Sequence, residues 1–408
     1  MTRTAPSTQL LRRVNAAALL ALMRESDVVT GTELVQATGL TRATVISVCE
    51  DLTEMGWVKE LASQRHTDDY VKGRPARRFT FDAGAGHVLG IDLGAGKTTA
   101  LLTDLVGKPL ARVTQVFDDV EAPADHRLKI LERTALAAVE EADIPRESVL
   151  AAAVGVAAPV SRDSIVTTDH WWQMFDVDLR AVLAERHGWH VLVENDANLA
   201  ALAEQWRGKG QGVEDLVVML AGERLGSGIL ESGRLLHGNS GGFGELGFVG
   251  LLEGVEAPSG IAKLARIWGQ QAVRSVAAPT SLHDLCHGDY EALTAEMVFA
   301  AAADGDRVAR EILDRVSTAM ARVIAAVSTL VDPELVVIGG AVADSADLFI
   351  PAITERLPAY TASSPRIAAS QLGDSIVTIG AVRRALSYVE DHALDLRPAR
   401  WSSRSRES

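Results

Sequence analysis

The sequence contains few cysteines, few aromatic residues and no long apolar run. Only Cys49 and Cys286 occur among 408 residues, which is too few for a disulfide framework or a cysteine metal site. Aromatic residues make up 5% of the chain, and nowhere do eighteen apolar residues follow one another. The first thirty residues lack a basic segment leading into an apolar run and a cleavage site. We therefore expect a soluble cytoplasmic protein without a membrane contact.

The charge is unevenly distributed along the chain. The net charge is −14, and such an acidic balance by itself argues against binding to nucleic acid, because phosphate contacts need lysine and arginine. Residues 1–82, however, contain 11 Lys and Arg against 10 Asp and Glu, whereas the remainder contains 29 against 44. This asymmetry fits a DNA-binding head joined to an acidic sensing or enzymatic body. A small domain that is poor in acidic residues by chance is the alternative.

A glycine-rich stretch, GIDLGAGKTTA at residues 90–100, resembles a nucleotide-binding loop at first sight. A P-loop needs a glycine five residues before its Gly-Lys-Thr, and that position is Ile91. The stretch is therefore not a P-loop, and Lys97 is not predicted to bind phosphate.

Residues 10–56 have the pattern of three helices. The first helix is predicted over residues 10–25, with an apolar face made by Leu10, Val14, Ala17, Ala18 and Ala21 and widened by Leu11 and Leu22. A short second helix follows, with Thr32 as its predicted N-cap and Gly39 at its end. Thr41 caps a longer third helix that ends at Gly56. The tight turn between the last two predicts a helix-turn-helix.

The third helix and the segment after it supply the predicted DNA contacts. The outward residues at the start of this helix are expected to enter the major groove, and they are Arg42, Ala43, Thr44, Ile46 and Ser47. Two alternating strands, WVKEL and RRFTFD, then predict a wing, whose four cations are suited to phosphates: Lys72, Arg74, Arg77 and Arg78. Each part alone also occurs in helical bundles or solvated loops, but together they favour a winged helix-turn-helix over residues 1–82.

From Gly86 onward, apolar strands alternate with helices, which indicates α/β organisation. Three strand-to-glycine turns are spread over about 250 residues, at GIDLGAG, MLAGERLG and VVIGGAV. A single dinucleotide-binding unit would carry one such turn. The repetition favours two lobes that hold a ligand in the cleft between them.

Five stretches of the body resemble the successive motifs of the ROK family, which holds bacterial sugar kinases and repressors: GIDLGAGKTTALLTDLVGKPL, GVAAPV, VENDANLAALAE, GSGILESGRLLHGNSGGFGELG and DPELVVIGGAVA. The head and the segment GRPARRFTFD resemble the winged-helix repressor branch of that family. The resemblance implies an N-terminal winged helix-turn-helix followed by a two-lobed actin-like, ribonuclease H-like sugar-kinase fold. We expect the first lobe at residues 83–198 together with 377–395, and the second at residues 199–376.

The resemblance also implies roles for individual residues. Asp92 and Gly94 correspond to the first phosphate turn of the family kinases, and Asp196 to the base that deprotonates the sugar hydroxyl. Asn195 and Glu245 would hydrogen-bond sugar hydroxyls. An N-cap at a strand-to-helix junction is the competing explanation for Asn195 and Asp196, because both residue types favour that position.

Three departures from the family pattern alter these expectations. Phe248 replaces a histidine that contacts sugar or zinc, so Phe248 either stacks on a sugar or fills the core. The following segment VGLLEGVEAPSG has no cysteine, so we predict no metal site. The second phosphate turn reads Gly222-Glu223-Arg224-Leu225-Gly226, where side chains replace small residues, so ATP binding is predicted to be weak or lost. Asp92 and Gly94 would then form a vestigial phosphate turn, without a cofactor.

Trp171 and Trp172 lie where the resemblance places a loop that reaches the sugar. They are expected either to present a carbohydrate-binding face or to pack in a buried hinge.

The main hypothesis is a sequence-specific DNA-binding transcriptional regulator, a repressor of carbohydrate-utilisation genes. A sugar or sugar derivative would bind Asn195, Asp196, Glu245 and Phe248, and a homodimer or homotetramer would bind a double-stranded DNA operator without enzymatic activity. Two alternatives stay open: a ROK-type sugar kinase with an accessory head, and a repressor controlled by a protein partner.

Overall fold

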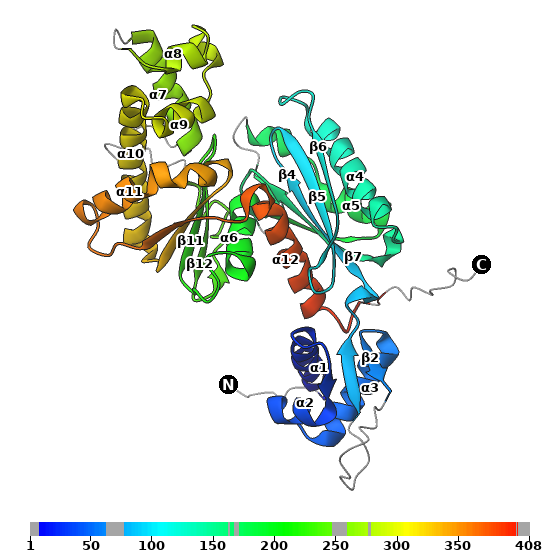
Figure 1. Ribbon diagram of the computed structural model, residues 1–408. Coiled ribbons are helices and arrows are strands. Elements are labelled where there is room, and N and C mark those ends of the chain that lie inside the picture. The colour runs from blue at the N-terminus through cyan, green and yellow to red at the C-terminus, as the bar shows by residue number, and fades with distance from the viewer. Residues whose placement is uncertain are drawn as a thin grey trace.

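The computed structural model describes residues 8–62, 77–161, 164–166, 171–246, 259–275, 279–396 and 398. A small N-terminal head lies at one end of a larger body with two lobes (Figure 1). This arrangement confirms the predicted fold class. Within the described residues, no helix is long and apolar enough to cross a membrane.

The head contains three helices and a small sheet. Its elements are α1 (Thr8–Arg24), β1 (Val29–Thr30), α2 (Gly31–Thr38), α3 (Arg42–Met55), β2 (Val58–Leu61) and β3 (Arg78–Phe81). The strands form an antiparallel sheet in the order β1-β3-β2, so the two predicted wing strands pair and a third short strand, which was not foreseen, joins them. α2 begins one residue after Thr30, and Thr30 is its N-cap; the prediction of Thr32 was wrong by one half-turn.

The predicted apolar face of α1 was also wrong. Leu10, Leu11 and Val14 are each about half exposed, whereas the buried stripe is formed by Ala16, Leu19, Leu20 and Met23. The run NAAALLALM carries small or apolar residues around most of the helix, so its periodicity allows more than one inward face. Packing against α3 and β3 selects the stripe that contains the larger side chains at the end of the helix.

Lobe one is built on a five-stranded sheet in the order β10-β7-β4-β5-β6. Its strands are β4 (His87–Leu93), β5 (Lys97–Asp104), β6 (Pro109–Val116), β7 (Val149–Val156) and β10 (His190–Asn195). β4, β5 and β6 form an antiparallel meander, while β7 and β10 run parallel to β4. One face of the sheet is covered by α4 (Ala124–Glu141) and α5 (Leu179–His187), and the other by α12 (Ile376–Asp391).

Lobe two repeats this design with a sheet in the order β13-β12-β11-β14-β15. Its strands are β11 (Leu216–Leu220), β12 (Gly226–Glu231), β13 (Arg234–Leu235), β14 (Leu335–Gly339) and β15 (Arg366–Ala369). One face carries α7 (Ile261–Ser275), α9 (Ala295–Ala303) and α10 (Arg307–Val331), with α8 (Leu282–Leu285) and α11 (Ile350–Arg356) beside them. Both sheets therefore have three antiparallel strands followed by two parallel ones, as expected of an actin-like pair of lobes.

Short elements fill the connections between these helices and strands. A two-stranded ribbon is formed by β8 (Val160–Ser161) and β9 (Ser164–Ile165). The 3₁₀ turns are η1 (Ala83–Ala85), η2 (Arg146–Ser148), η3 (Trp172–Phe175), η5 (Tyr290–Ala292), η6 (Ala341–Leu348), η7 (Leu357–Ala359) and η8 (Gly373–Ser375).

Two helices join the lobes. α6 (Asp196–Arg207) lies on the inner face of the lobe-two sheet and packs against α12, which lies on lobe one (Figure 1). α6 lies very close to both α12 and β12. A Cβ added to Gly380 of α12 would lie 1.8 Å from the carbonyl oxygen of Leu199 in α6, and a Cβ added to Gly228 of β12 would lie 2.1 Å from the carbonyl oxygen of Ala197 in α6. Only glycine permits this contact. α12 then continues down to the head, where it meets α1.

Candidate functional site

The helix-turn-helix is fixed by its caps. Thr30 and Glu33 form a capping box at the start of α2, and Gly39 ends that helix in the left-handed conformation with a φ of 68°. The Thr41 hydroxyl accepts the amide of Thr44 at 3.2 Å and contacts the Thr44 hydroxyl at 2.9 Å. These contacts set the angle at which α3 leaves the turn, so the start of α3 is presented rigidly.

The five predicted base-reading residues of α3 are not equally accessible. Arg42, Ala43 and Ser47 are exposed, which places them on the outer surface of the head. Thr44 is half-buried, and its hydroxyl contacts Thr41 as described above. Ile46 is also half-buried: its Cδ1 lies 3.3 Å from the position that a Cβ would take on Gly31, so Ile46 packs against the start of α2.

The wing cations have different surroundings. Arg77 donates from Nε to Glu60 at 2.7 Å and from Nη1 to Glu50 at 2.5 Å, and its guanidinium lies 5.4 Å from the ring centre of Phe79. The hydrogen bonds to Glu60 and Glu50 raise the pKa of Arg77 above its ordinary value. Arg77 thus ties the wing to α3, a role that the sequence analysis missed. Arg78 lies in β3, while Lys72 and Arg74 lie outside the described residues.

Asn195 occupies the junction between β10 and α6 as a helix cap. Its side-chain oxygen accepts the amides of Ala197 at 2.9 Å and Asn198 at 3.1 Å, and its amide group donates to the carbonyl of Ala158 at 3.1 Å. The Asn195 side chain is buried, and its carbonyl oxygen accepts both of these amide hydrogen bonds. The geometry therefore matches the competing explanation from the sequence, and Asn195 positions its neighbour Asp196.

Three carboxyl groups from both lobes interact electrostatically and define the interlobe site: Asp92 at the end of β4, Asp196 at the start of α6, and Glu245 after β13. Burial, and after it the charges of Asp92 and Glu245, raise the pKa of Asp196 to about 7, although the hydrogen bond from the Ala197 amide lowers it. Burial likewise raises the pKa of Asp92 to about 7. Burial raises the pKa of Glu245, while Arg224 lowers it. Such groups can accept or donate hydrogen bonds to hydroxyls near neutral pH.

The turn after β4 is supported from beneath. The buried Arg127 of α4 donates to the carbonyl oxygens of Gly94 at 3.1 Å and Ala95 at 2.9 Å. Lys97 instead contacts Asp374 at 3.2 Å, which also contacts Arg112 at 3.1 Å. Arg127 was not predicted as a site residue, because its signal in the sequence is that of any charged residue within an amphipathic helix.

A second polar pair was also missed beside Asn195. His237 Nε2 donates to Glu194 Oε2 at 2.8 Å, which joins the segment after β13 in lobe two to the end of β10 in lobe one. Burial raises the pKa of Glu194, but the hydrogen bonds from His237 and Asn198 outweigh burial and lower this pKa below its ordinary value. The hydrogen bond to Glu194 raises the pKa of His237. A glutamate within an apolar strand was the available signal in the sequence.

The altered second turn packs against α7. The carbonyl of Ala221 accepts the Ile261 amide at 2.8 Å, and Glu223 forms an ion pair with Arg266 at 2.7 Å. Leu225 is buried. Arg224 extends toward lobe one, with its guanidinium carbon 5.3 Å from the ring centre of Trp171. Phe248 lies outside the described residues, and within those residues no group of three or more His, Cys, Asp or Glu side chains is arranged to hold a metal.

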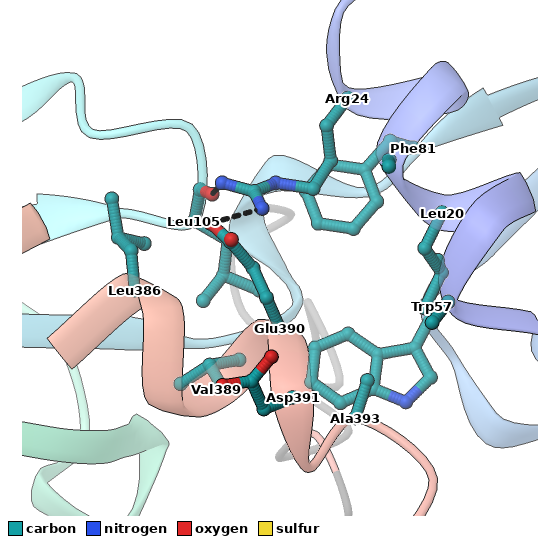
Figure 2. A pocket seen from close by; sticks show the side chains of 12 residues that line it. Leu20, Arg24, Trp57, Phe81, Leu105, Leu386, Val389, Glu390, Asp391 and Ala393 are labelled. Atoms are coloured by element: carbon teal, nitrogen blue, oxygen red, sulfur yellow. Dashed lines mark hydrogen bonds and ion pairs between the residues drawn. The ribbon is translucent and has the colours of Figure 1, made fainter. Parts of the chain in front are cut away.

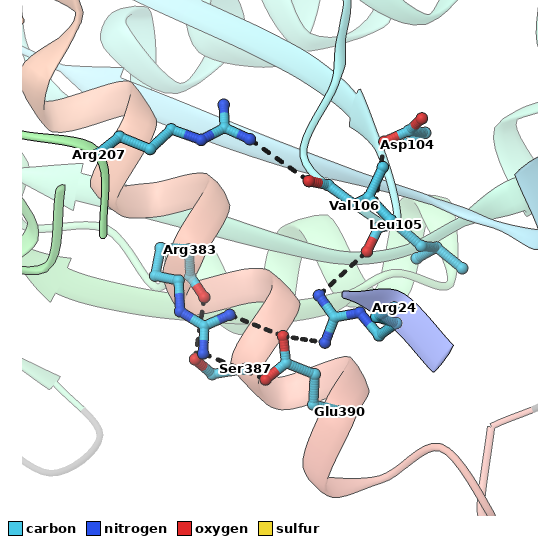
Figure 3. A network of polar contacts seen from close by, with 8 residues as sticks. All are labelled: Arg24, Asp104, Leu105, Val106, Arg207, Arg383, Ser387 and Glu390. Atoms are coloured by element: carbon cyan, nitrogen blue, oxygen red, sulfur yellow. Dashed lines mark hydrogen bonds and ion pairs between the residues drawn. The ribbon is translucent and has the colours of Figure 1, made fainter. Parts of the chain in front are cut away.

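The head meets the body at a joint formed by Arg24 of α1, Glu390 of α12 and the β5–β6 turn at Leu105. Arg24 forms an ion pair with Glu390 and donates to the Leu105 carbonyl at 3.2 Å, and Arg383 donates to Glu390 at 2.7 Å (Figure 3). Arg207, the last residue of α6, donates to the carbonyl of Val106 in the same turn at 3.3 Å. One turn is thus held by the head and by α6 together.

A cavity of about 210 Å³ lies beside this joint (Figure 2). Its walls come from the head and from α12, and they include Leu20, Trp57, Phe81, Leu386 and Val389. The contact between the head and α12 is therefore not completely packed.

The chain is similar to known regulators and to known sugar kinases. It is 24% identical over 398 residues to the xylose repressor of Caldicellulosiruptor bescii, which covers 93% of this chain and 96% of that protein. It is 30% identical to the glucokinase of Thermotoga maritima, over 67% of this chain and 87% of that one.

Solved structures agree on the fold. A ROK family transcriptional regulator described as a homologue of the Escherichia coli MLC protein superposes with a TM-score of 0.77 at 22% identity, over 95% of this chain and 98% of that one. A model of the IclR helix-turn-helix domain matches residues 14–62. A model of the ROK family matches residues 88–387, well over half of the sequence, and the chain therefore belongs to the ROK family.

Proposed function

We propose that this protein is a sequence-specific DNA-binding transcriptional repressor of carbohydrate-utilisation genes, with a sugar or sugar derivative as its effector. The observation that supports this most is the connection between its two parts. α6 begins at Asp196 in the interlobe site and ends at Arg207, which contacts the turn that also holds Arg24 of the head. A rigid helix of 12 residues therefore runs between the proposed effector site and the joint.

The proposed DNA contacts follow from exposure. Arg42, Ala43 and Ser47 lie on the outer surface at the start of α3, the part of such a helix that enters the major groove. Arg42 can hydrogen-bond a guanine edge or a phosphate. Arg78 is the described wing residue that we assign to the DNA backbone, with Lys72 and Arg74 beside it in sequence. We assign Arg77 to holding the wing, because two glutamates already engage its guanidinium.

The proposed release mechanism is a shift in the populations of two head orientations. A sugar that contacts Asp196 and Glu245 binds to both lobes at once. Any movement of α6 that follows is passed to Val106 through the hydrogen bond from Arg207. The β5–β6 turn fits tightly at this point, since a Cβ on Gly107 would lie 2.4 Å from the Trp206 ring. The two heads of a pair of copies would then no longer match the spacing of the two operator half-sites.

A mobility-shift experiment tests this function. The probe is the DNA upstream of the gene for this protein, with a panel of pentoses, hexoses and their derivatives added. We expect a specific shift that one sugar class reverses, and at least a tenfold weaker shift for Arg42→Ala. Arg133→Ala, on the exposed surface of α4, is the matched control and should bind as the parent does. The absence of any specific DNA binding would overturn the proposal.

A sugar kinase is the second candidate, because Asp92 and Asp196 are both present in the interlobe site with pKa values that burial raises to about 7. We propose that no turnover occurs, since Glu223, Arg224 and Leu225 stand where the phosphates of ATP would need close contact with backbone amides. A coupled ADP-release assay with hexoses and pentoses decides between the two. Turnover that is abolished by Asp196→Asn would favour the kinase.

A further inference from the structure

Arg224 makes an unusual contact between the two lobes. It lies in the turn between β11 and β12 of lobe two, and its guanidinium carbon is 5.3 Å from the ring centre of Trp171 and 5.9 Å from that of Trp172. Both tryptophans belong to lobe one, where Trp172 is buried and Trp171 half-buried. A cation at this distance from indole rings is held by their π-electrons.

The neighbours of Arg224 fix its direction. Glu223 is bound to Arg266 of α7, Leu225 is buried, and the carbonyl of Ala221 accepts the Ile261 amide. The turn is therefore bound to α7 through the residues before Arg224, and the residue after it, Leu225, is buried. The Arg224 side chain is exposed, and among the described residues no carboxylate lies within ion-pair distance of it.

Within the part of the chain that the structure describes, the guanidinium of Arg224 therefore lies over two aromatic rings and has no ion-pair partner. Aromatic rings do not accept the N–H groups of a guanidinium as a carboxylate does, so these groups stay available for a planar or tetrahedral anion. Glu245 is the carboxyl group on which its charge acts, and Glu245 belongs to the interlobe site with Asp92 and Asp196. A ligand in that site can therefore present hydroxyls to the carboxyl groups and a second group to Arg224.

We propose that the effector is a sugar that carries an anionic group, a phosphate monoester or a carboxylate, and that Arg224, which lies over Trp171 and Trp172, binds this group. A neutral sugar would leave the Arg224 guanidinium without a partner anion, whereas an anionic derivative forms one or two charge-assisted hydrogen bonds there. This proposal rests on the proposed function, because it takes the interlobe site to be the effector site.

Calorimetry on the full chain without DNA tests the proposal. The probes are matched sets of an aldose, its terminal phosphate ester and its uronic acid, beginning with glucose, glucose 6-phosphate and glucuronate and extending to the other common hexoses and pentoses. We expect the anionic members of one set to bind about 10–100-fold more tightly than the neutral sugar. The two anionic arms show whether the phosphate or the carboxylate is preferred.

Two variants assign that preference to Arg224. Arg224→Gln should remove the advantage of the anionic ligand and leave the affinity for the neutral sugar within about twofold, whereas Arg224→Lys should retain part of it. Arg133→Gln is the control. The tryptophan fluorescence of the parent should change when the anionic ligand binds, and this change should be lost in Trp171→Phe.

Three results would overturn the proposal: equal affinity for neutral and anionic sugars, a preference that persists in Arg224→Gln, or no binding of any sugar. If no sugar binds while the specific mobility shift of the DNA persists, the sugar effector is wrong but the DNA-binding function stands. If sugars bind and DNA does not, the DNA-binding function fails independently.

Discussion

Asp92 and Asp196 are acidic side chains that the fold keeps partly protonated near neutral pH. Burial raises the pKa of each to about 7, compared with an ordinary value of 3.8. Because the folded pKa values exceed the unfolded one, the stabilising contribution of these groups is fully present below about pH 4. It is lost as the pH rises through 7. These two residues therefore make the folded protein less stable in mildly alkaline solution.

Asp196→Asn should remove half of this effect. The variant cannot ionise at this position, so we expect its stability relative to the parent to grow by on the order of 2 kcal/mol between pH 4 and pH 8, then to level off. Thermal and urea unfolding at several pH values measure it. Asp118→Asn, on the exposed loop after β6, is the control and should differ from the parent equally at every pH. An Asp196→Asn difference that does not vary with pH would contradict the assigned burial.

Some residues that the sequence assigns to ligand or DNA binding make structural contacts within the fold. Asn195 could bind sugar or cap a helix, and three hydrogen bonds to Ala197, Asn198 and Ala158 match the second role. Arg77 was predicted only to bind phosphate, whereas in the structure it contacts Glu50 and Glu60, which lie 27 and 17 residues away in sequence. Such partners cannot be read from the local sequence, because the fold alone brings them together.

At the scale of elements, α6 depends on the cap at its start. Asn195→Ala should destabilise the protein by about 1–2 kcal/mol, because two amides in the first turn of α6 lose their acceptor. Urea denaturation gives this difference. The affinity for the sugar should fall by less than about tenfold, because it changes only to the extent that Asp196 is displaced. A variant that keeps full stability but loses all sugar affinity would show that Asn195 binds the ligand directly.

The joint between α1 and α12 is the second element-scale feature that can be tested. Although burial opposes it, hydrogen bonds and charges from Arg383 and Arg24 lower the pKa of Glu390, so this carboxylate compensates two guanidinium groups. Glu390→Gln would leave both cations facing a neutral amide. We expect a loss of about 1–3 kcal/mol in stability and a smaller effect of the sugar on DNA binding.

Denaturation and the mobility shift, each with and without sugar, measure the two consequences separately. Glu141→Gln at the exposed end of α4 is the control, with both properties unchanged. If Glu390→Gln lowers stability but leaves the sugar response intact, the joint holds the head without transmitting the signal.

Whole elements were easier to predict than their faces. Helices with clear caps, such as α3 between Thr41 and Gly56, were predicted to within a residue. α1 was predicted as a helix but with the wrong inward face, since its alanines and leucines surround most of it and the choice depends on what it packs against. The half-exposed Leu10, Leu11 and Val14 belong to that misassigned face.

At the scale of the molecule, the sequence predicted the two lobes because strand and glycine-turn patterns repeat. The sheets confirm this, since each has three antiparallel strands and two parallel ones in the same order. The sequence could not predict how α12 serves both lobe one and the head. That contact joins residues more than 360 positions apart, such as Arg24 and Glu390.

The charge of the whole molecule bears on how many copies bind DNA. The chain carries a net charge of −14, while residues 1–82 hold 11 cations against 10 acidic residues. A single head of this kind gains little from phosphate attraction, and the acidic body repels the duplex. We therefore expect stable binding only when two linked heads act together, because the second contact is then intramolecular and raises the overall affinity by about 100-fold or more.

Sedimentation of the protein with operator DNA measures this directly. The expected complex contains at least two chains per operator, and DNA with one half-site scrambled should bind about 100-fold more weakly than the intact site. Raising the salt from 50 to 200 mM should weaken both, since each head still releases counterions from the phosphates that it contacts. A complex of one chain per operator with undiminished affinity for the single half-site would show that the acidic body does not oppose binding, and that one head suffices.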